Sequence, residues 1–497
     1  MKLELILGLL VPLACPAGVV CAAQATPHPT AVTHHRTHIN GRELSYTATV
    51  AEDLIRQKDG SAGAAVVTIS YTLDGVADHA HRPVLFAFNG GPGASSSPLH
   101  MSAMGPRVHG AEGVGIHRDN DLVDNTSSPL DVTDLVFIDP VSTGFSRPLG
   151  GVDPQQWYGG KVDALEVATV IQDWLKSHHR ERSPKYLAGE SYGTTRAGLI
   201  VKYAPALKLN GVLLVSGGGG GNDTPSRAVD LLANMAVGAW YHHKVDRRGL
   251  TAEQFYQDAL AFGRGAYSAA LTNTGLTPEE LHQVAQRVAG YIGLPVSLIE
   301  SSRLQVTRND WMFNLLREQG LRTGLLDTRA TGKWCPNMQG GIDDPAMGFV
   351  PSDTCAPPNK PPTPASVGPR ESPSVGRYLR EELKFADSDP YYGVNLLANS
   401  LWGKGAGAGD GEPATAQIMA EAMRADPHLR LAAVSGFYDL GSAEGSAFAQ
   451  AGIPVNRLTL LRLASGHEVY DPTFGGEEDR TRFNEAVREF ITAKPLQ

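Results

Sequence analysis

The stretch KYLAGESYG, residues 185–193, contains the pattern G-x-S-x-G directly after a short apolar run. A helix-compatible run, residues 194–203, follows it, so the serine stands between a predicted strand and a predicted helix. At such a junction small neighbours let the chain turn sharply and leave the serine hydroxyl exposed. A plain turn would also fit the pattern, but this context favours Ser191 as a nucleophile at the end of a buried strand.

Similar apolar runs recur along the chain and predict the strands of one sheet. They lie at residues 84–88, 135–138, 186–188, 212–215, 429–434 and 458–463. Most run directly into Gly, Asp or Ser, as buried parallel strands do where functional loops follow. Helical stripes lie between them, for example Leu165, Ala168, Ile171 and Leu175. Strands that alternate with helices predict an α/β fold, with a mostly parallel central sheet and helices on both faces.

The middle of the chain has a different character, which predicts an insertion. Helical patterns dominate residues 225–402, and no convincing buried strand is found there. The patterns cover residues 228–241, 252–270, 278–289 and 311–319. Within the insertion, residues 351–373 contain eight prolines and predict an exposed, extended loop. We therefore expect a core in two parts, residues 26–224 and 403–497, separated by a mainly helical insertion or cap.

A serine nucleophile needs a general base and an acid that orients it, and these follow the serine in the order Asp, His in α/β folds of this kind. Asp439 comes shortly after the run at 429–434, and His467 comes shortly after the run at 458–463. Both therefore stand at carboxyl ends of predicted strands, where the sites of α/β sheets lie. Taken singly, each could be structural. Their order and placement together predict that His467 accepts the Ser191 proton and that Asp439 fixes the imidazole tautomer.

Composition and charge limit the classes of molecule that the protein could bind. The 497 residues carry a net charge of −9, with 43 basic and 52 acidic residues and no long basic run, which argues against nucleic acid as a partner.

Residues 1–25 have a lysine, an apolar run and small residues suited to cleavage, and they predict an export signal peptide. An uncleaved membrane anchor is the alternative, but Pro12 and Pro16 count against a spanning helix. The mature protein is expected to be secreted or periplasmic, without a membrane span.

Two cysteines remain after the predicted signal, Cys335 and Cys355. In an oxidising compartment such a pair predicts one disulfide, and two unpaired buried cysteines are the alternative. Four histidines lie close together near the mature N-terminus, at His28, His34, His35 and His38. They lack a defined scaffold that could hold a metal ion. Neither a metal nor an organic cofactor is predicted.

Five motifs, in this order, give the chain a family resemblance. They are FNGGPGASSSPLH (88–100), FIDPVSTGFSRP (137–148), GESYG (189–193), SGFYDL (435–440) and SGHEVY (465–470). From about residue 82 to its end the chain resembles the serine carboxypeptidases, the peptidase S10 family of the α/β-hydrolase fold. The insertion phrases AWYHHK (239–244) and LLDTRATG (325–332) are similar to bacterial members. The resemblance implies a serine-type carboxypeptidase that acts on peptide or protein C-termini without a cofactor.

The resemblance also implies roles for residues around the nucleophile. The backbone N–H groups of Gly91 and Tyr192 would form the oxyanion hole, which stabilises the charge of the tetrahedral intermediate. Asn89 and Glu190 would bind the free carboxylate of the substrate, with Glu190 donating a hydrogen bond as a neutral acid. A carboxyl beside a substrate carboxylate should have a raised pKa, because two close negative charges disfavour each other. An acidic optimum for peptides is therefore expected.

Several positions depart from the family pattern. Many members carry a second glutamate that pairs with the one beside the serine, and here that position is Ala103. A tryptophan and a cysteine usual around NGGPG are replaced by Ala87 and Ala94, and one residue is missing between Asp139 and Pro140. These departures leave the predicted triad intact. They keep an esterase or acyltransferase on the same scaffold open as an alternative, and a binding protein without catalysis as a remote one.

Overall fold

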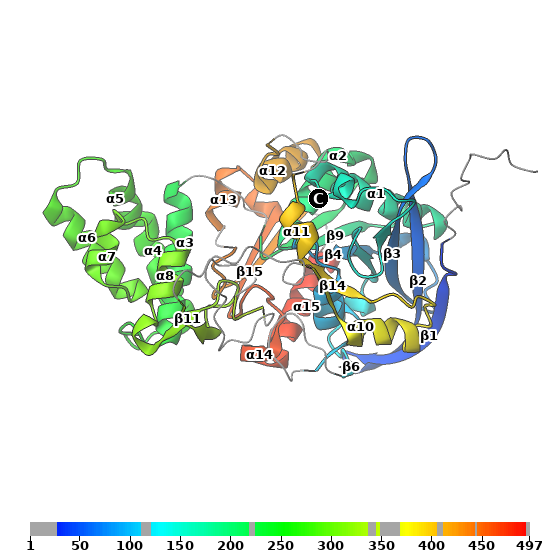
Figure 1. Ribbon diagram of the computed structural model, residues 1–497, viewed down its shortest axis with the longest axis horizontal. Coiled ribbons are helices and arrows are strands. Elements are labelled where there is room, and N and C mark those ends of the chain that lie inside the picture. Colours follow the sequence, from blue (N-terminus) through cyan, green and yellow to red (C-terminus); the bar gives the residue numbers. More distant parts are fainter. Residues whose placement is uncertain are drawn as a thin grey trace, which may run out of the picture.

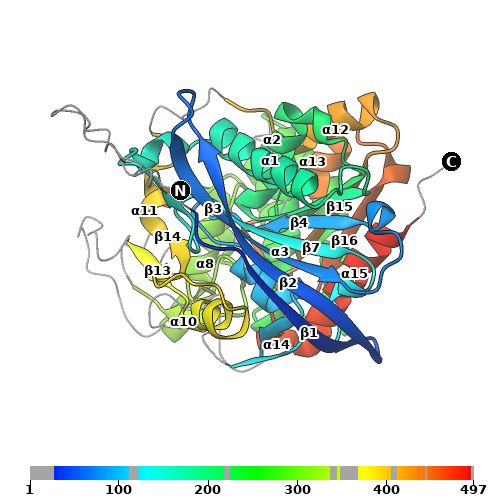
Figure 2. The same cartoon turned by 90° about the vertical axis from the view of Figure 1, so that its right-hand side faces the viewer.

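A long mixed sheet forms the centre of the protein (Figures 1 and 2). The computed structural model describes residues 27–110, 121–217, 224–335, 344–347, 368–404, 411–442 and 445–493. Within them the sheet has the strand order β1-β2-β3-β7-β4-β9-β10-β15-β16, and β8 pairs with β3 at the side. The strands are β1 (Ala31–Ile39), β2 (Arg42–Arg56), β3 (Ala62–Leu73), β4 (Val84–Phe88), β7 (Asp134–Asp139), β8 (Arg147–Pro148), β9 (Lys185–Glu190), β10 (Gly211–Val215), β15 (Arg430–Gly436) and β16 (Leu458–Leu463).

The larger part of the sheet, from β7 to β16, is parallel. All six strands predicted from apolar runs lie in this part, so the predicted mostly parallel α/β-hydrolase sheet is confirmed. The antiparallel strands β1, β2 and β3 precede it, and the sequence analysis did not identify them. In β2 buried and partly exposed positions alternate over most of its length. Such a strand carries no continuous apolar run, which explains why it was missed.

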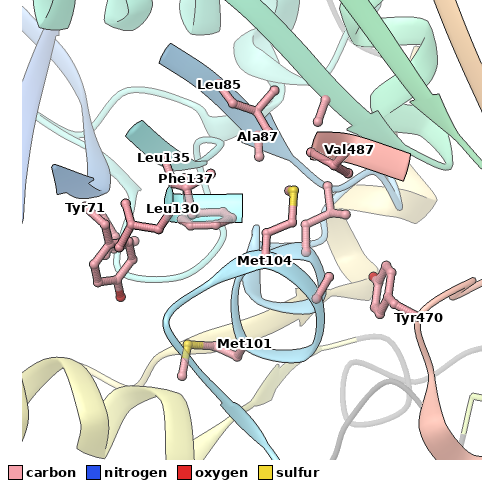
Figure 3. Packing of buried hydrophobic residues seen from close by; sticks show 14 of the residues in the cluster. Tyr71, Leu85, Ala87, Met101, Met104, Leu130, Leu135, Phe137, Tyr470 and Val487 are labelled. Atoms are coloured by element: carbon pink, nitrogen blue, oxygen red, sulfur yellow. The ribbon is translucent and has the colours of Figure 1, made fainter. Parts of the chain in front are cut away.

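Helices cover both faces of the sheet because successive strand residues point to opposite sides. Val84, Phe86 and Phe88 of β4 pack in one cluster with helices α1 (Gly160–Ser177), α2 (Tyr192–Tyr203) and α12 (Thr415–Ala425). Leu85 and Ala87 pack on the other side, where α15 (Glu477–Thr492) and the π-helical turn η2 (Leu99–Met104) lie. Figure 3 shows this second cluster around Met104 and Val487. Both faces of the strand that leads to the NGGPG segment are therefore buried.

A body of helices stands apart from the sheet, at the left of Figure 1. It comprises α3 (Thr224–Tyr241), α4 (Ala252–Phe262), α5 (Ser268–Thr272), α6 (Pro278–Ile292), α7 (Val296–Ser301) and α8 (Arg308–Asn314). Thr251 and Thr277 begin α4 and α6 with complete capping boxes, which satisfy N–H groups of the first turn. The body has its own hydrophobic cluster, which also includes Phe437, Tyr438 and Leu440 beside Asp439. It therefore packs directly against the loop that carries the predicted acid.

The remainder of residues 225–402 packs differently from this body. The strap, as we call residues 368–404, contains β13 (Pro369–Glu371), α10 (Pro373–Arg377), β14 (Tyr392–Asn395) and α11 (Leu396–Leu401). Its side chains, including Tyr378 and Leu379, join the core cluster around the sheet. The expectation that residues 225–402 contain no buried strand is wrong, because β14 is largely buried. This strand has only four residues, too few to show a period in the sequence.

Several predictions fall partly or wholly outside the described residues. The signal peptide at residues 1–25, Cys355 and residues 351–367 of the proline-rich loop are among them, so the disulfide stays a prediction. In the part of the chain that is described, no helix combines the length and the apolarity needed to cross a bilayer. Three of the N-terminal histidines lie in β1, and the ring of His28 contacts the buried carboxylate of Glu52 at 2.7 Å. No group of three potential metal ligands was found in that same part of the chain.

Candidate active site

Ser191 stands at a sharp turn between β9 and α2, with the backbone at φ 58° and ψ −125°. A positive φ is strained for a serine, and such strain is typical of functional turns. The flanking glycines make the turn possible. A Cβ at Gly189 would collide with the carbonyl oxygen of Gly193, and a Cβ at Gly193 would lie 2.8 Å from the carbonyl oxygen of Phe88. The G-x-S-x-G pattern thus reflects backbone segments that touch.

The predicted base and acid form a hydrogen-bonded pair. His467 Nδ1 lies 2.7 Å from Asp439 Oδ2. The Asp439 side chain is fully buried, accepts the Gly441 N–H at Oδ1 over 2.6 Å, and accepts the hydroxyl of Ser442 at Oδ2. Since β15 and β16 are parallel neighbours, the loops that follow them meet at one edge of the sheet. This explains how residues 28 positions apart become partners.

The nucleophile and the base face the same cavity, which has a volume of about 300 Å³. Ser191, His467, Asn89, Gly91 and Glu190 all line it. The structure therefore brings together these five of the seven predicted site residues around one space. Asp439 reaches the cavity through His467, and Tyr192 directly follows the nucleophile at the start of α2.

The NGGPG segment lies against the turn of Ser191 because its glycines allow close approach. A Cβ at Gly90 would collide with the backbone nitrogen of Tyr192. Gly91 has φ 97°, and a Cβ there would lie 2.8 Å from the backbone nitrogen of Ala94. The buried Arg196 side chain donates to the carbonyl oxygen of Asn89 and pairs with Asp163 at 2.8 Å. The segment is thereby held beside the N-terminus of α2, where the N–H groups of the first turn have no partner within the helix.

Asn89 and Glu190 are both buried, and both line the cavity beside Ser191. The Asn89 Oδ1 accepts the Leu99 N–H over 3.0 Å, which leaves its amide N–H groups to donate toward the carboxyl. Burial raises the pKa of Glu190 to about 7, although the charge of His467 and hydrogen bonds from Tyr470 and Asn89 lower it. A carboxyl of this kind retains a proton in mildly acidic solution. It then offers a hydrogen-bond donor beside the nucleophile.

Comparison with known proteins agrees with this geometry. The family model of the serine carboxypeptidases, peptidase S10, matches residues 71–207, which include the NGGPG segment and the turn of Ser191. Over these residues the chain is similar to the serine carboxypeptidases. Asp439 and His467 lie outside the matched range.

A solved structure of a carboxypeptidase shares the fold of this protein. Kex1Δp, a prohormone-processing carboxypeptidase from Saccharomyces cerevisiae, matches with a TM-score of 0.50 at 14% identity, over 89% of this chain and 90% of that one. A proline iminopeptidase from Mycobacterium smegmatis gives a TM-score of 0.36 at 12% identity, over 88% of this chain and 97% of that one. No curated protein matches significantly. At 14% identity the match to Kex1Δp supports the fold alone.

The helical insertion contacts the loops of Asp439 and His467 through backbone hydrogen bonds. The carbonyl oxygen of Leu326 accepts the His467 N–H over 2.7 Å, and that of Leu325 accepts the Leu440 N–H over 3.0 Å. The buried carboxyl of Asp344 accepts the N–H groups of Leu325 and Leu326 at 2.9 to 3.1 Å. Sequence reasoning missed these roles, because backbone acceptors leave no residue signature. The phrase at 325–332, noted for its resemblance, was the one signal.

The cavity walls are mainly apolar and come from two directions. The insertion contributes Leu325, Leu326 and Met347, and the core and the strap contribute Ala94, Pro98, Val394 and Leu396. The charged groups in the lining are Glu190, Asp344, His467 and Glu468. The sequence could not place these walls, since they join segments far apart in the chain.

The ionisable groups of the site are strongly linked. Burial lowers the pKa of His467, but the Asp439 carboxylate raises it, with further contributions from Glu190 and Asp344, and the net pKa is about 9. Glu190 and His467 therefore influence each other's protonation. When Glu190 is neutral, one of the negative charges that raise the pKa of His467 disappears. The neutral acid and the neutral base consequently favour each other.

Proposed function

We propose that this enzyme is an exported carboxypeptidase that removes C-terminal residues through an acyl-enzyme on Ser191. His467 takes the proton of the Ser191 hydroxyl as Oγ attacks the scissile carbonyl carbon. The N–H groups of Gly91 and Tyr192 donate to the resulting oxyanion. The C–N bond then breaks, and His467 gives the proton to the leaving amine. Water, activated by the same imidazole, releases the acyl group in a second round.

The observation that carries the proposal is the buried pair of Asn89 and Glu190 beside the nucleophile. A substrate carboxylate bound there would raise the pKa of Glu190 further, because like charges repel. Glu190 would then keep its proton and donate a hydrogen bond to the substrate carboxylate. Binding of a free C-terminus would thereby hold Glu190 in its neutral form. A C-terminal amide lacks the charge and would lack this effect.

The proposal is tested with three matched substrates at pH 4 to 8: a blocked dipeptide, its C-terminal amide and a simple ester. We expect efficient hydrolysis of the free acid and little of the amide. Covalent labelling by an organophosphonate should occur on the wild type and not on Ser191→Ala. Equal turnover of acid and amide would contradict carboxylate recognition.

An esterase or acyltransferase is the second candidate, and two observations favour it. Ala103 removes one family acid, and the cavity walls are apolar. In the same experiment this candidate predicts turnover of the ester alone. Fold and triad are common to both functions, so the substrates have to separate them.

Export is supported by the sequence of residues 1–25. We expect the mature protein in the periplasm or the medium, with an N-terminus close to residue 26. Fractionation and N-terminal sequencing of the protein expressed with its full leader would check this. An intact N-terminus in the cytoplasmic fraction would contradict it.

A further inference from the structure

The buried hydroxyl of Tyr470 donates to Glu190 Oε2 over 2.6 Å. Tyr470 is 0% exposed and Glu190 3% exposed, so water does not compete for this bond. Tyr470 follows His467 by three positions in the loop after β16. The Asn89 side chain is buried too and lowers the pKa of both Glu190 and Tyr470. We call Glu190, Asn89 and Tyr470 the carboxyl cluster.

Ala103 cannot contribute to the carboxyl cluster, since its side chain ends at Cβ. It lies in the η2 turn, and its carbonyl oxygen accepts the amides of Asn125 and Asn484, each over 2.8 Å. Ala103 and Tyr470 belong to the same buried cluster, and Figure 3 shows the Tyr470 ring beside the η2 turn. The phenol of Tyr470, which belongs to the same loop as His467, thus lies next to the η2 turn.

We propose that Tyr470 is the positioning residue that holds Glu190 for recognition of the substrate carboxylate, in place of the acid missing at Ala103. This inference rests on the proposed carboxypeptidase function and deepens it. A phenol and a second carboxyl would act differently. Two carboxyls can exchange a proton, and either one can be donor or acceptor. Burial raises the pKa of the Tyr470 phenol well above its usual value, so the phenol keeps its proton and always donates.

A fixed donor gives the carboxyl of Glu190 a fixed polarity. Because Oε2 accepts from Tyr470, the acidic proton of Glu190 is directed to Oε1, which then serves as the donor to the substrate. The same bond stabilises the ionised carboxyl and lowers its pKa. Three other ionisable groups act on the pair of Glu190 and Tyr470. They are His467, Asp439 and Glu468, which precedes Tyr470 by two positions.

The test compares pH profiles of kcat/KM for a blocked dipeptide acid and its amide. In Tyr470→Phe the ionised carboxyl loses a donor, so its pKa rises. Loss of a hydrogen bond to a charged group should raise the pKa of Glu190 by about one to two units. The alkaline limb of the profile for the acid substrate should move to higher pH by the same amount. The amide profile should not move, because its binding does not require a neutral Glu190. An unchanged limb for the acid would overturn the inference.

Two further variants separate positioning from a general structural effect. Tyr470→3-fluorotyrosine keeps the shape of the ring but is a stronger donor, so it should move the limb in the opposite direction, to lower pH. In the Glu190→Gln background, Tyr470→Phe should cause no additional shift, because the titrating group is gone. Tyr71→Phe is the matched control, since Tyr71 is also fully buried with a 2.6 Å hydrogen bond, to His100, away from the cavity.

The outcomes distinguish this inference from the proposed function. A wild type that hydrolyses acid and amide equally would contradict the carboxypeptidase function itself. A wild type that prefers the acid, combined with unchanged limbs in both Tyr470 variants, would overturn the role of Tyr470 alone. Limb shifts of the same size in Tyr71→Phe would overturn it as well, because they would report a general effect of losing a buried hydroxyl.

Discussion

Glu190 determines the pH dependence expected of this enzyme. Its pKa is raised to about 7 by burial, so the neutral donor is present below that pH and is lost as the pH rises through it. Hydrolysis of free-acid peptides should decline along the same limb. Glutamine stays neutral at every pH, so Glu190→Gln should abolish this limb while the Ser191 chemistry remains. The pH profile of kcat/KM on the dipeptide acid checks this, and an alkaline limb identical to that of the wild type would refute the assignment.

Gly91 is the second residue on which a precise expectation rests. A methyl group there would press on the backbone of Ala94 and strain a residue with φ 97°. Gly91→Ala should displace one oxyanion donor and lower kcat by about 10² to 10³-fold. The control is Gly75→Ala, which has φ 71° but nothing within 4 Å of the added Cβ. Both glycines have a positive φ, so an equal loss of kcat in the two variants would contradict an oxyanion role.

At the scale of elements, the loop of residues 325–328 connects the helical body to the catalytic loops. Asp344 fixes it by accepting the N–H groups of Leu325 and Leu326. Asp344→Ala leaves these donors without that acceptor and should loosen the Leu326 carbonyl that holds His467. We expect kcat to fall by about tenfold or more, which corresponds to about 1.4 kcal/mol in the barrier. Asp344→Asn keeps one acceptor oxygen, so its kcat should fall less. Equal kcat in the wild type and both variants would show that Asp344 does not support the position of His467.

The residues proposed as catalytic could be found in the sequence because each lies in a local pattern. Ser191 stands in a motif, and Asp439 and His467 follow apolar runs in the expected order. Tyr470 and Asp344 were not predictable, because their roles depend on which strand ends become neighbours and on backbone atoms as partners. The antiparallel strands β1 and β2 were missed for a related reason. Buried and more exposed positions alternate in them, so they lack the continuous apolar runs that marked the parallel strands.

At the scale of the whole molecule, the helical body and the hydrolase core should unfold together. Trp311 is fully buried in the body, and its indole donates to the Ile292 carbonyl oxygen over 2.8 Å. Trp311→Ala should destabilise the protein by about 3–5 kcal/mol. Because the same cluster includes Phe437 and Tyr438 beside the acid, activity should be lost in the same denaturant transition as the helical signal. A first transition that melts helices and leaves activity intact would show that the body is independent.

The backbone contacts of Leu325 and Leu326 have a consequence for how this enzyme can change its substrates in evolution. The side chains of both residues form the cavity wall, while their carbonyl oxygens hold the catalytic loops. Exchanging one side chain for another reshapes the wall and leaves the carbonyl bonds in place. Adding or deleting a residue there would shift the carbonyls and disturb the base. Selection for new specificity at this wall should therefore proceed by substitution at constant loop length.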